Sequence, residues 1–167
     1  LARSGMLSEQ QAWQGLHDGF GRGRADRGGG TLGEATGKGW AHTMRIYWSG
    51  AAIMMLADVQ LRDTSNGRQS LDSALAKLQD CCLDNTRRWR ARELFVELDR
   101  LTGTRIFTGL YGRHVDSRTF PDVSNTWQSL GILTSSRRVR LVQDAELAPL
   151  RSAIMQASGD GKLTVLP

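Results

Sequence analysis

The segment from residue 43 to residue 62 constrains the fold of this chain most strongly, because its apolar residues cover much of a helix's circumference. At 3.6 residues per turn, these side chains point in several directions instead of forming a single stripe. They are Ile46, Ile53, Met54, Leu56, Ala57 and Leu61. A helix with this pattern is buried on most of its sides. We therefore expect residues 43–62 to form the central helix, with the other elements packed around it.

Further helical patterns lie on both sides of this central segment, over residues 8–20, 70–78, 91–101 and 106–115. Ser8 and Ser70 are expected N-caps, since each precedes a run with helical apolar spacing. Gly103 stands where a C-terminal glycine cap is common. The spacing therefore predicts a mainly α fold with at least four helices before Phe120, and it confines any strands to the tail.

The segment from Gly21 to Gly39 is rich in glycine and arginine. We expect Gly19, Gly21 and the glycines after them to end the first helix. The run Gly28-Gly29-Gly30-Thr31 lacks the Gly-Lys-Ser/Thr ending of a phosphate-binding loop, and no strand precedes it. We therefore predict a mobile surface loop over residues 21–39, with a role that the sequence leaves open.

The pattern changes after Ile132. The expected elements are a strand at 138–142, a helix at 145–157, a hairpin-type turn at 159–161 and a strand at 163–166. Pro149 is expected to interrupt the helix, because proline has no backbone N–H. We predict two parts: a helical part over residues 1–132, and a small, possibly β-containing tail over residues 133–167 that packs on the helices.

The chain is basic, with a formal net charge of +5 and a pI of about 9.9. Its arginines are dispersed, apart from short groups at 22–27, 87–92 and 137–140. Basic patches can bind nucleic acid, but no lysine run and no platform of aromatic residues accompanies these groups. We expect a solvated surface and no nucleic-acid partner. No stretch reaches the ~18 apolar residues of a membrane-spanning helix, so no membrane partner is expected either.

The two cysteines, Cys81 and Cys82, are adjacent. On a helix their side chains point about 100° apart, and pairing them would distort the helix. We therefore expect free thiols, at least one of them buried, which weakly favours a reducing compartment. The compartment itself, cytoplasmic or periplasmic, is left open. No other Cys or His pair has the spacing of metal ligands, so no metal is expected in this chain.

Three motifs follow one another in and after the central helix. Tyr47-Trp48-Ser49-Gly50 opens the helix, Asp58 to Arg62 closes it, and Gly67 to Asp72 leads into the next helix. This order resembles the C-terminal half of the catalytic domain in the glycyl aminopeptidase family of zinc metallopeptidases, which are gluzincins with a thermolysin-like domain. There, a Tyr-x-Lys-Gly box leads a helix ending in Asp-Leu-x-Ile-Arg, and a Gly-x-x-Ser-Leu-Asp-Asp turn follows. Ser49 stands where the box has lysine.

The resemblance extends over residues 1–132. Residues 1–8 are similar to the family's Arg-Ala-Gly-Leu-Ile segment, which follows shortly after the glutamate ligand of its zinc. Residues 106–115 and 120–131 resemble its Phe-Phe-x-x-Tyr-Val and Pro-Tyr-x-x-x-Leu-x-x-Leu-Gly segments. The three histidines here include no pair at i, i+4, as H-E-x-x-H requires. The resemblance thus implies a fragment: the zinc ligands lie upstream of residue 1, and zinc is expected only in the full-length parent.

The resemblance also implies a role for Tyr47. In the broader group of related aminopeptidases, the tyrosine of this box is expected to donate a hydrogen bond to the oxyanion formed in peptide hydrolysis. A phenol is a neutral donor at pH 7, and one positioned donor contributes a few kcal/mol to such a transition state. Tyr47 is thus the one expected catalytic residue. A tyrosine packed at a helix start is the structural alternative.

Two functional hypotheses from different classes remain. The first is the C-terminal fragment of a zinc-dependent aminopeptidase-like protein, inactive alone, whose partners are the N-terminal remainder of its own catalytic domain and a peptide substrate. The second is a non-catalytic helical protein-interaction module from a degenerate peptidase homologue. A basic nucleic-acid-binding helical domain is a weaker third, which steeply salt-dependent DNA binding would support.

Overall fold

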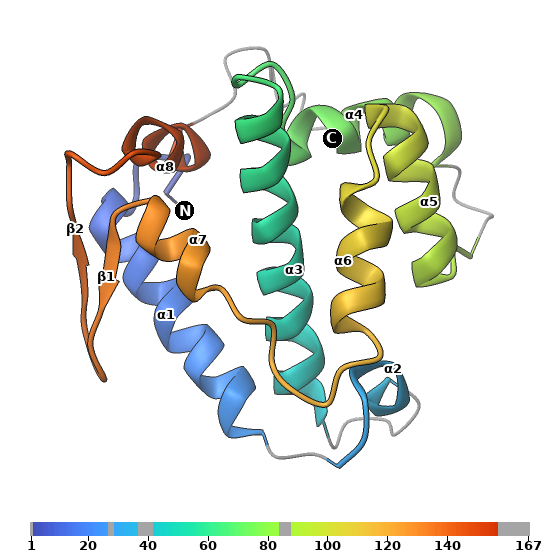
Figure 1. Ribbon diagram of the computed structural model, residues 1–167, viewed down its shortest axis with the longest axis horizontal. Helices are drawn as coiled ribbons and strands as arrows, with labels where there is room; N and C mark the ends of the chain where they lie inside the picture. The colour runs from blue at the N-terminus through green and yellow to red at the C-terminus, as the bar shows by residue number, and fades with distance from the viewer. Residues whose placement is uncertain (1, 27–28, 37–41, 84–87, 157–167) are drawn as a thin grey trace.

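The computed structural model describes residues 2–26, 29–36, 42–83 and 88–156 (Figure 1). The described helices are α1 (Glu9–Ala25), α2 (Leu32–Ala35), α3 (Thr43–Thr64), α4 (Leu71–Cys82), α5 (Ala91–Thr102), α6 (Ile106–His114), α7 (Ser124–Ser129) and α8 (Ala148–Met155). The strands are β1 (Ile132–Thr134) and β2 (Val139–Leu141). The mainly α prediction is confirmed. Within the described ranges, six helices and no strand precede Phe120, as the apolar spacing predicts.

Helix α3 is the central element. It contacts α1, α2, α4, α6 and α8, and Figure 1 shows it standing between α1 on one side and α5 and α6 on the other. Its core-facing residues include Ala52, Ile53, Leu56, Val59 and Leu61, all buried. The prediction of a central helix buried on most sides is therefore confirmed, and the helix runs two residues beyond Arg62.

The expected caps begin and end the helices where the sequence places them. The Ser8 hydroxyl accepts a hydrogen bond from the backbone N–H of Gln11, whose side chain accepts one from Ser8 N–H, and Ser70 pairs with Ser73 in the same way. Gly103 ends α5 with a φ of 68°, in the left-handed region where glycine is favoured. These boundaries are set by local chemistry.

Helix α1 continues beyond the glycines that were expected to end it. A Cβ at Gly19 would overlap the indole of Trp48, and one at Gly23 would lie 2.5 Å from the ring of Phe120. These glycines therefore let aromatic side chains approach the α1 backbone, and this packing offsets their low helix propensity. The predicted loop over residues 21–39 is wrong in part, because residues 21–25 and 32–35 are helical. Residues 27–28 and 37–39 lie outside the described ranges.

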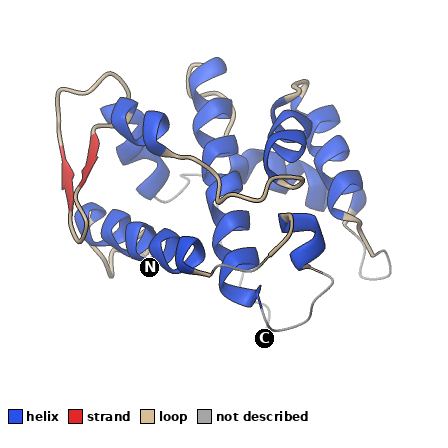
Figure 2. Cartoon of the chain, turned by 60° about the horizontal axis from the view of Figure 1, so that its bottom comes forward, coloured by secondary structure: helices blue, strands red, loops and turns tan. Residues whose placement is uncertain are grey.

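The tail begins with an antiparallel hairpin, in which Ile132 pairs with Leu141 and Thr134 with Val139. The hairpin lies at one edge of the helices (Figure 2), and the predicted strand at 138–142 is confirmed at 139–141. Pro149 lies in the first turn of α8 and does not interrupt it, because the first N–H groups of a helix have no intrahelical partner. The expected turn at 159–161 and strand at 163–166 lie outside the described residues.

Arg151 of α8 holds this tail to the helices. Its side chain is 0% exposed, and its Nε donates to Glu9 Oε1 of α1 at 2.7 Å. Its Nη1 donates to the carbonyl oxygens of Leu130 and Val142 at 2.9 and 2.7 Å, and its Nη2 to the side chain of Gln143 at 2.9 Å. One buried guanidinium thus connects α1, the end of α7 and the hairpin.

Candidate functional site

The first turn of α3, which carries Tyr47, is held by a carboxylate from the end of α1. Asp26 Oδ2 accepts a hydrogen bond from the backbone N–H of Arg45 at 3.3 Å, and Asp26 Oδ1 lies 3.1 Å from Nδ1 of His42. This carboxylate acts as the N-cap that the His42 side chain does not provide. The buried Arg45 guanidinium donates to the carbonyl oxygens of Gly30 and Arg118 at 3.1 and 2.9 Å. The start of α3 is therefore fixed on both sides.

Tyr47 lies on the outer face of this fixed turn. Its side chain is 64% exposed, and its ring meets the edge of the Trp48 ring with centroids 5.0 Å apart. The guanidinium of Arg22 lies 5.0 Å from the centroid of the Trp48 ring on the same side of the molecule. Among the described residues, the Tyr47 hydroxyl has no hydrogen-bond partner. The donor that the resemblance assigns to catalysis is therefore accessible, and its ring is not part of the core.

The face of α3 that carries Tyr47 is open in its first half and covered in its second half. The open half, which we call the open stripe, consists of the exposed Met44 and Tyr47 and the half-buried Gly50, Ala51 and Met54. Met44 is 45% exposed and Tyr47 is 64% exposed. Asp58 lies eleven residues after Tyr47, three turns along the same face, and it is buried.

The two other residues of the tyrosine box lie in different surroundings. A Cβ at Gly50 would meet no described atom within 4 Å, so none of the described neighbours requires a glycine there. Ser49, at the position where the resembled box has lysine, is only 1% exposed. A lysine there would place a charge in the core. The burial of Ser49 therefore disfavours a lysine at this position.

The residues matching the helix end and the following turn meet in one network. Asp58 Oδ1 accepts from the backbone N–H of Leu71 at 2.7 Å, and both its carboxylate oxygens lie 3.1 Å from Arg62 Nε. Arg62 lies 3.7 Å from Asp72, which also pairs with Arg3 at 2.7 Å. Asp58 and Arg62 therefore form an i, i+4 ion pair that is largely buried. Asp72 lies in the first turn of α4 and pairs with both Arg3 and Arg62.

A polar cleft of about 710 Å³ lies on a different side of α3 from Tyr47. It is lined by Arg24, Asp26, Arg45, Arg118 and Asp122, among others. Arg45 is two residues before Tyr47, so their side chains point about 160° apart around the helix. Hydrogen bonds from Ser124 lower the pKa of Asp122, which keeps this carboxylate ionised. The structure does not bring Tyr47 and this cleft into one site, and no sequence motif indicates the cleft.

The three histidines do not assemble a zinc site of the peptidase type. His17 pairs with Asp18 at 3.3 Å on α1, and His42 pairs with Asp26. Burial, followed by the charge of Arg113, lowers the pKa of His114 at the end of α6. In the part of the chain that the structure describes, no histidine belongs to a group of three metal-ligand donors. These residues therefore do not fit a catalytic zinc, and no reaction step is derived through one.

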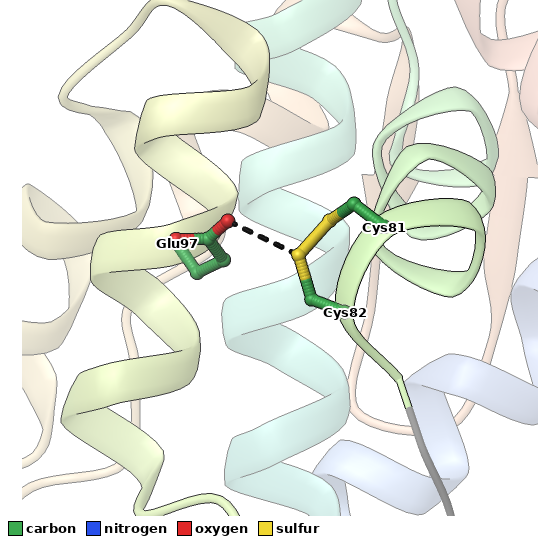
Figure 3. A group of neighbouring side chains, drawn as sticks. All are labelled: Cys81, Cys82 and Glu97. Atoms are coloured by element: carbon green, nitrogen blue, oxygen red, sulfur yellow. Dashed lines mark hydrogen bonds between the residues drawn. A yellow bond between two sulfur atoms is a disulfide. The ribbon is translucent and has the colours of Figure 1, made fainter.

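Cys81 and Cys82 form a disulfide, which overturns the expectation of free thiols (Figure 3). Neither is buried, since Cys81 is exposed and Cys82 is half-buried. They occupy the last two positions of α4, and the chain leaves helical geometry at Leu83 with φ −89° and ψ 79°. The argument from a regular helix is therefore wrong here, because the pair lies where the helix ends.

No protein-family model, no curated protein and no solved structure matches this chain. Among the described residues, no helix is both long enough and apolar enough to cross a membrane.

Proposed function

We propose that this chain is the C-terminal helical part of a zinc-dependent aminopeptidase-like catalytic domain, and that Tyr47 is its hydrogen-bond donor to the reacting carbonyl. The zinc ligands of that domain would come from residues outside this chain. The partner of this chain is then the N-terminal remainder of its own catalytic domain, and a peptide is the substrate of the assembled protein.

The accessible hydroxyl of Tyr47 on the fixed first turn of α3 is the observation that carries this proposal. A catalytic donor must be accessible to substrate and held in place before the reaction. The 64% exposure of Tyr47 meets the first requirement. The hydrogen bond from Arg45 N–H to Asp26 and the burial of the Arg45 side chain meet the second.

The open stripe gives the proposed partner a surface to cover. Met44 is exposed beside Tyr47, Ala51 and Met54 are half-buried along the same stripe, and Gly50 leaves space for close approach of another segment. A partner that covered this stripe would exclude water around the Tyr47 hydroxyl. A hydrogen bond in such an environment stabilises developing charge more strongly than one in bulk water.

Expression of the chain together with its natural upstream residues tests this proposal. With the Cys81–Cys82 disulfide intact, the longer protein should hold one zinc per chain after dialysis and should hydrolyse aminoacyl amides with small N-terminal residues. The chain of residues 1–167 alone, as the matched control, should do neither in its oxidised form. A longer protein that folds but neither retains zinc nor hydrolyses these amides would refute the enzymatic proposal.

A non-catalytic interaction module is the second candidate, and the replacement of the box lysine by the buried Ser49 favours it. In this alternative the open stripe binds a helical partner, and Tyr47 contributes contact area instead of a catalytic donor. An upstream sequence without H-E-x-x-H and its glutamate would support this alternative, whereas intact ligands would support the enzyme.

A further inference from the structure

Two cysteines and one glutamate from neighbouring helices meet at the end of α4. The ligand atoms of Cys81, Cys82 and Glu97 all lie within 4.8 Å of one another. Figure 3 shows the Glu97 carboxylate of α5 directed at the sulfur of Cys82, with its Oε1 3.4 Å from that sulfur. Cys81 is exposed, and Cys82 and Glu97 are half-buried, so solvent reaches the group.

Reduction would turn this group into a set of three metal ligands. Two electrons and two protons convert the disulfide into two thiols, and a dithiol or a phosphine supplies the electrons. A phosphine is oxidised to its oxide in this step and takes its oxygen from one water molecule. A divalent cation then displaces both thiol protons, because the thiolate is the form that binds metal.

The geometry suits a small thiophilic cation. Zinc bound tetrahedrally at about 2.3 Å from each sulfur and about 2.0–2.2 Å from a carboxylate oxygen needs its ligand atoms roughly 3.5–3.8 Å apart. Separating the two sulfurs to this distance requires side-chain rotation, and Glu97 Oε1 already lies 3.4 Å from Cys82 Sγ. Water would occupy the fourth position on the exposed side.

We propose that reduced Cys81 and Cys82, together with Glu97, bind one thiophilic divalent cation such as Zn²⁺, and that formation of the disulfide abolishes this site. The ligand set is two thiolates and one carboxylate, and the bound ion would join the end of α4 to the middle of α5. The sequence spacing gave no sign of this site, because Glu97 lies fifteen residues after Cys82 and on a different helix.

Arg100 supplies a matched control for the role of Glu97. Its Nη2 lies 2.6 Å from Glu97 Oε1 in an exposed i, i+3 ion pair. The Arg100 cation therefore competes with a metal for the same carboxylate. Glu97→Gln removes the ion pair and the anionic ligand together, whereas Arg100→Gln removes only the ion pair.

Cadmium and zinc titrations of the full chain test the proposal. The protein is reduced with a phosphine, which is then removed under argon. It is titrated with Cd²⁺ while the thiolate-to-cadmium charge-transfer absorbance is recorded. Its affinity for Zn²⁺ is measured separately, by competition with a chromophoric chelator. We expect one Cd²⁺ per reduced chain and none bound by the disulfide form. Glu97→Gln should weaken Zn²⁺ binding at least about 10–100-fold, the loss seen on removing even an outer partner of a metal ligand. Arg100→Gln should bind as tightly as the reduced wild type or more tightly.

Several results would overturn this inference. Reduced wild type that binds Cd²⁺ no better than the Cys81→Ser, Cys82→Ser double variant would show that the thiols are not ligands. If Glu97→Gln bound Zn²⁺ with the affinity of the reduced wild type, the carboxylate would not be a ligand. A ratio of one Cd²⁺ to two chains would show that the ion bridges two copies instead of binding within one chain. Circular dichroism of every variant establishes that the helices are intact.

Discussion

Replacing Arg151 with methionine should destabilise the protein strongly, although this residue lies far from Tyr47. Methionine retains much of the volume but leaves the carbonyl oxygens of Leu130 and Val142 and the carboxylate of Glu9 without their donor. Each buried acceptor left unsatisfied costs about 1 kcal/mol or more. Glu9 is 28% exposed and can be partly hydrated. The total is therefore about 3 kcal/mol, at the low end of the roughly 3–5 kcal/mol for breaking a buried ion pair.

Thermal and urea unfolding of Arg151→Met measure this cost, and Arg100→Met is the matched control. The two arginines make ion pairs of nearly equal length, 2.7 Å to Glu9 and 2.6 Å to Glu97, but their side chains are 0% and 63% exposed. For a chain of this size, about 3 kcal/mol corresponds to a fall in Tm of roughly 6–12 °C. Loss of the exposed Arg100–Glu97 pair should change Tm far less, because solvent screens it. Equal losses in the two variants would refute the argument that burial, and not distance, sets the magnitude.

Three further predictions concern the packing at Gly19, the buried carboxylate of Asp99 and the protonation of His114. Gly19→Ala should lower the free energy of unfolding by about 1–3 kcal/mol, because the added methyl group overlaps Trp48. Gly15→Ala is its control: with open space around it, the same change should raise the free energy of unfolding by up to about 1 kcal/mol in urea unfolding. Asp99→Asn should lower the free energy of unfolding by about 2 kcal/mol, since the Asp99 carboxylate accepts hydrogen bonds from the backbone N–H groups of Phe107 and Thr108 at the start of α6. An unchanged urea midpoint would contradict this. Burial lowers the pKa of His114, so the unfolded chain binds the proton more readily and stability should fall as pH drops below about 6.5. His114→Gln should show a smaller fall in Tm between pH 7.5 and 5.5, and an identical pH profile would contradict this.

The features of the fold that the sequence predicts are those decided by short stretches of chain. Ser8, Ser70 and Gly103 begin or end helices through contacts within a few residues, and the apolar period of residues 43–62 identifies the central helix without knowledge of its partners. The strand at 139–141 follows from alternation in the same way.

The errors come from partners that are distant in the sequence or from a boundary placed wrongly. Gly19 and Gly23 continue α1 because Trp48 and Phe120 pack on them, and no local pattern announces those contacts. The importance of Arg151 depends on Glu9, which lies 142 residues away. The disulfide was excluded on the assumption of a regular helix at Cys82, but α4 ends there.

The candidate site was only partly predictable. The motif order gave Tyr47 and the Asp58–Arg62 pair, and the helical period alone places Tyr47 and Asp58 on one face. Whether that face is open or covered depends on where α4 and the N-terminal segment pack, and this is tertiary information. The group of Cys81, Cys82 and Glu97 depends on the contact between α4 and α5, so its residues appear unrelated along the sequence.

The effect of Tyr47→Phe on kcat in the longer protein, the chain with its natural upstream residues, tests the proposed function most directly. Phenylalanine keeps the ring and its contact with Trp48 and removes only the donor. If the hydroxyl stabilises the oxyanion, kcat should fall by roughly 10²–10³-fold, with kcat/KM falling in parallel and with KM and Tm almost unchanged. A folded Tyr47→Phe variant with the kcat of the wild type, or an upstream-extended wild type without peptidase activity, would contradict the proposal that Tyr47 is a catalytic residue.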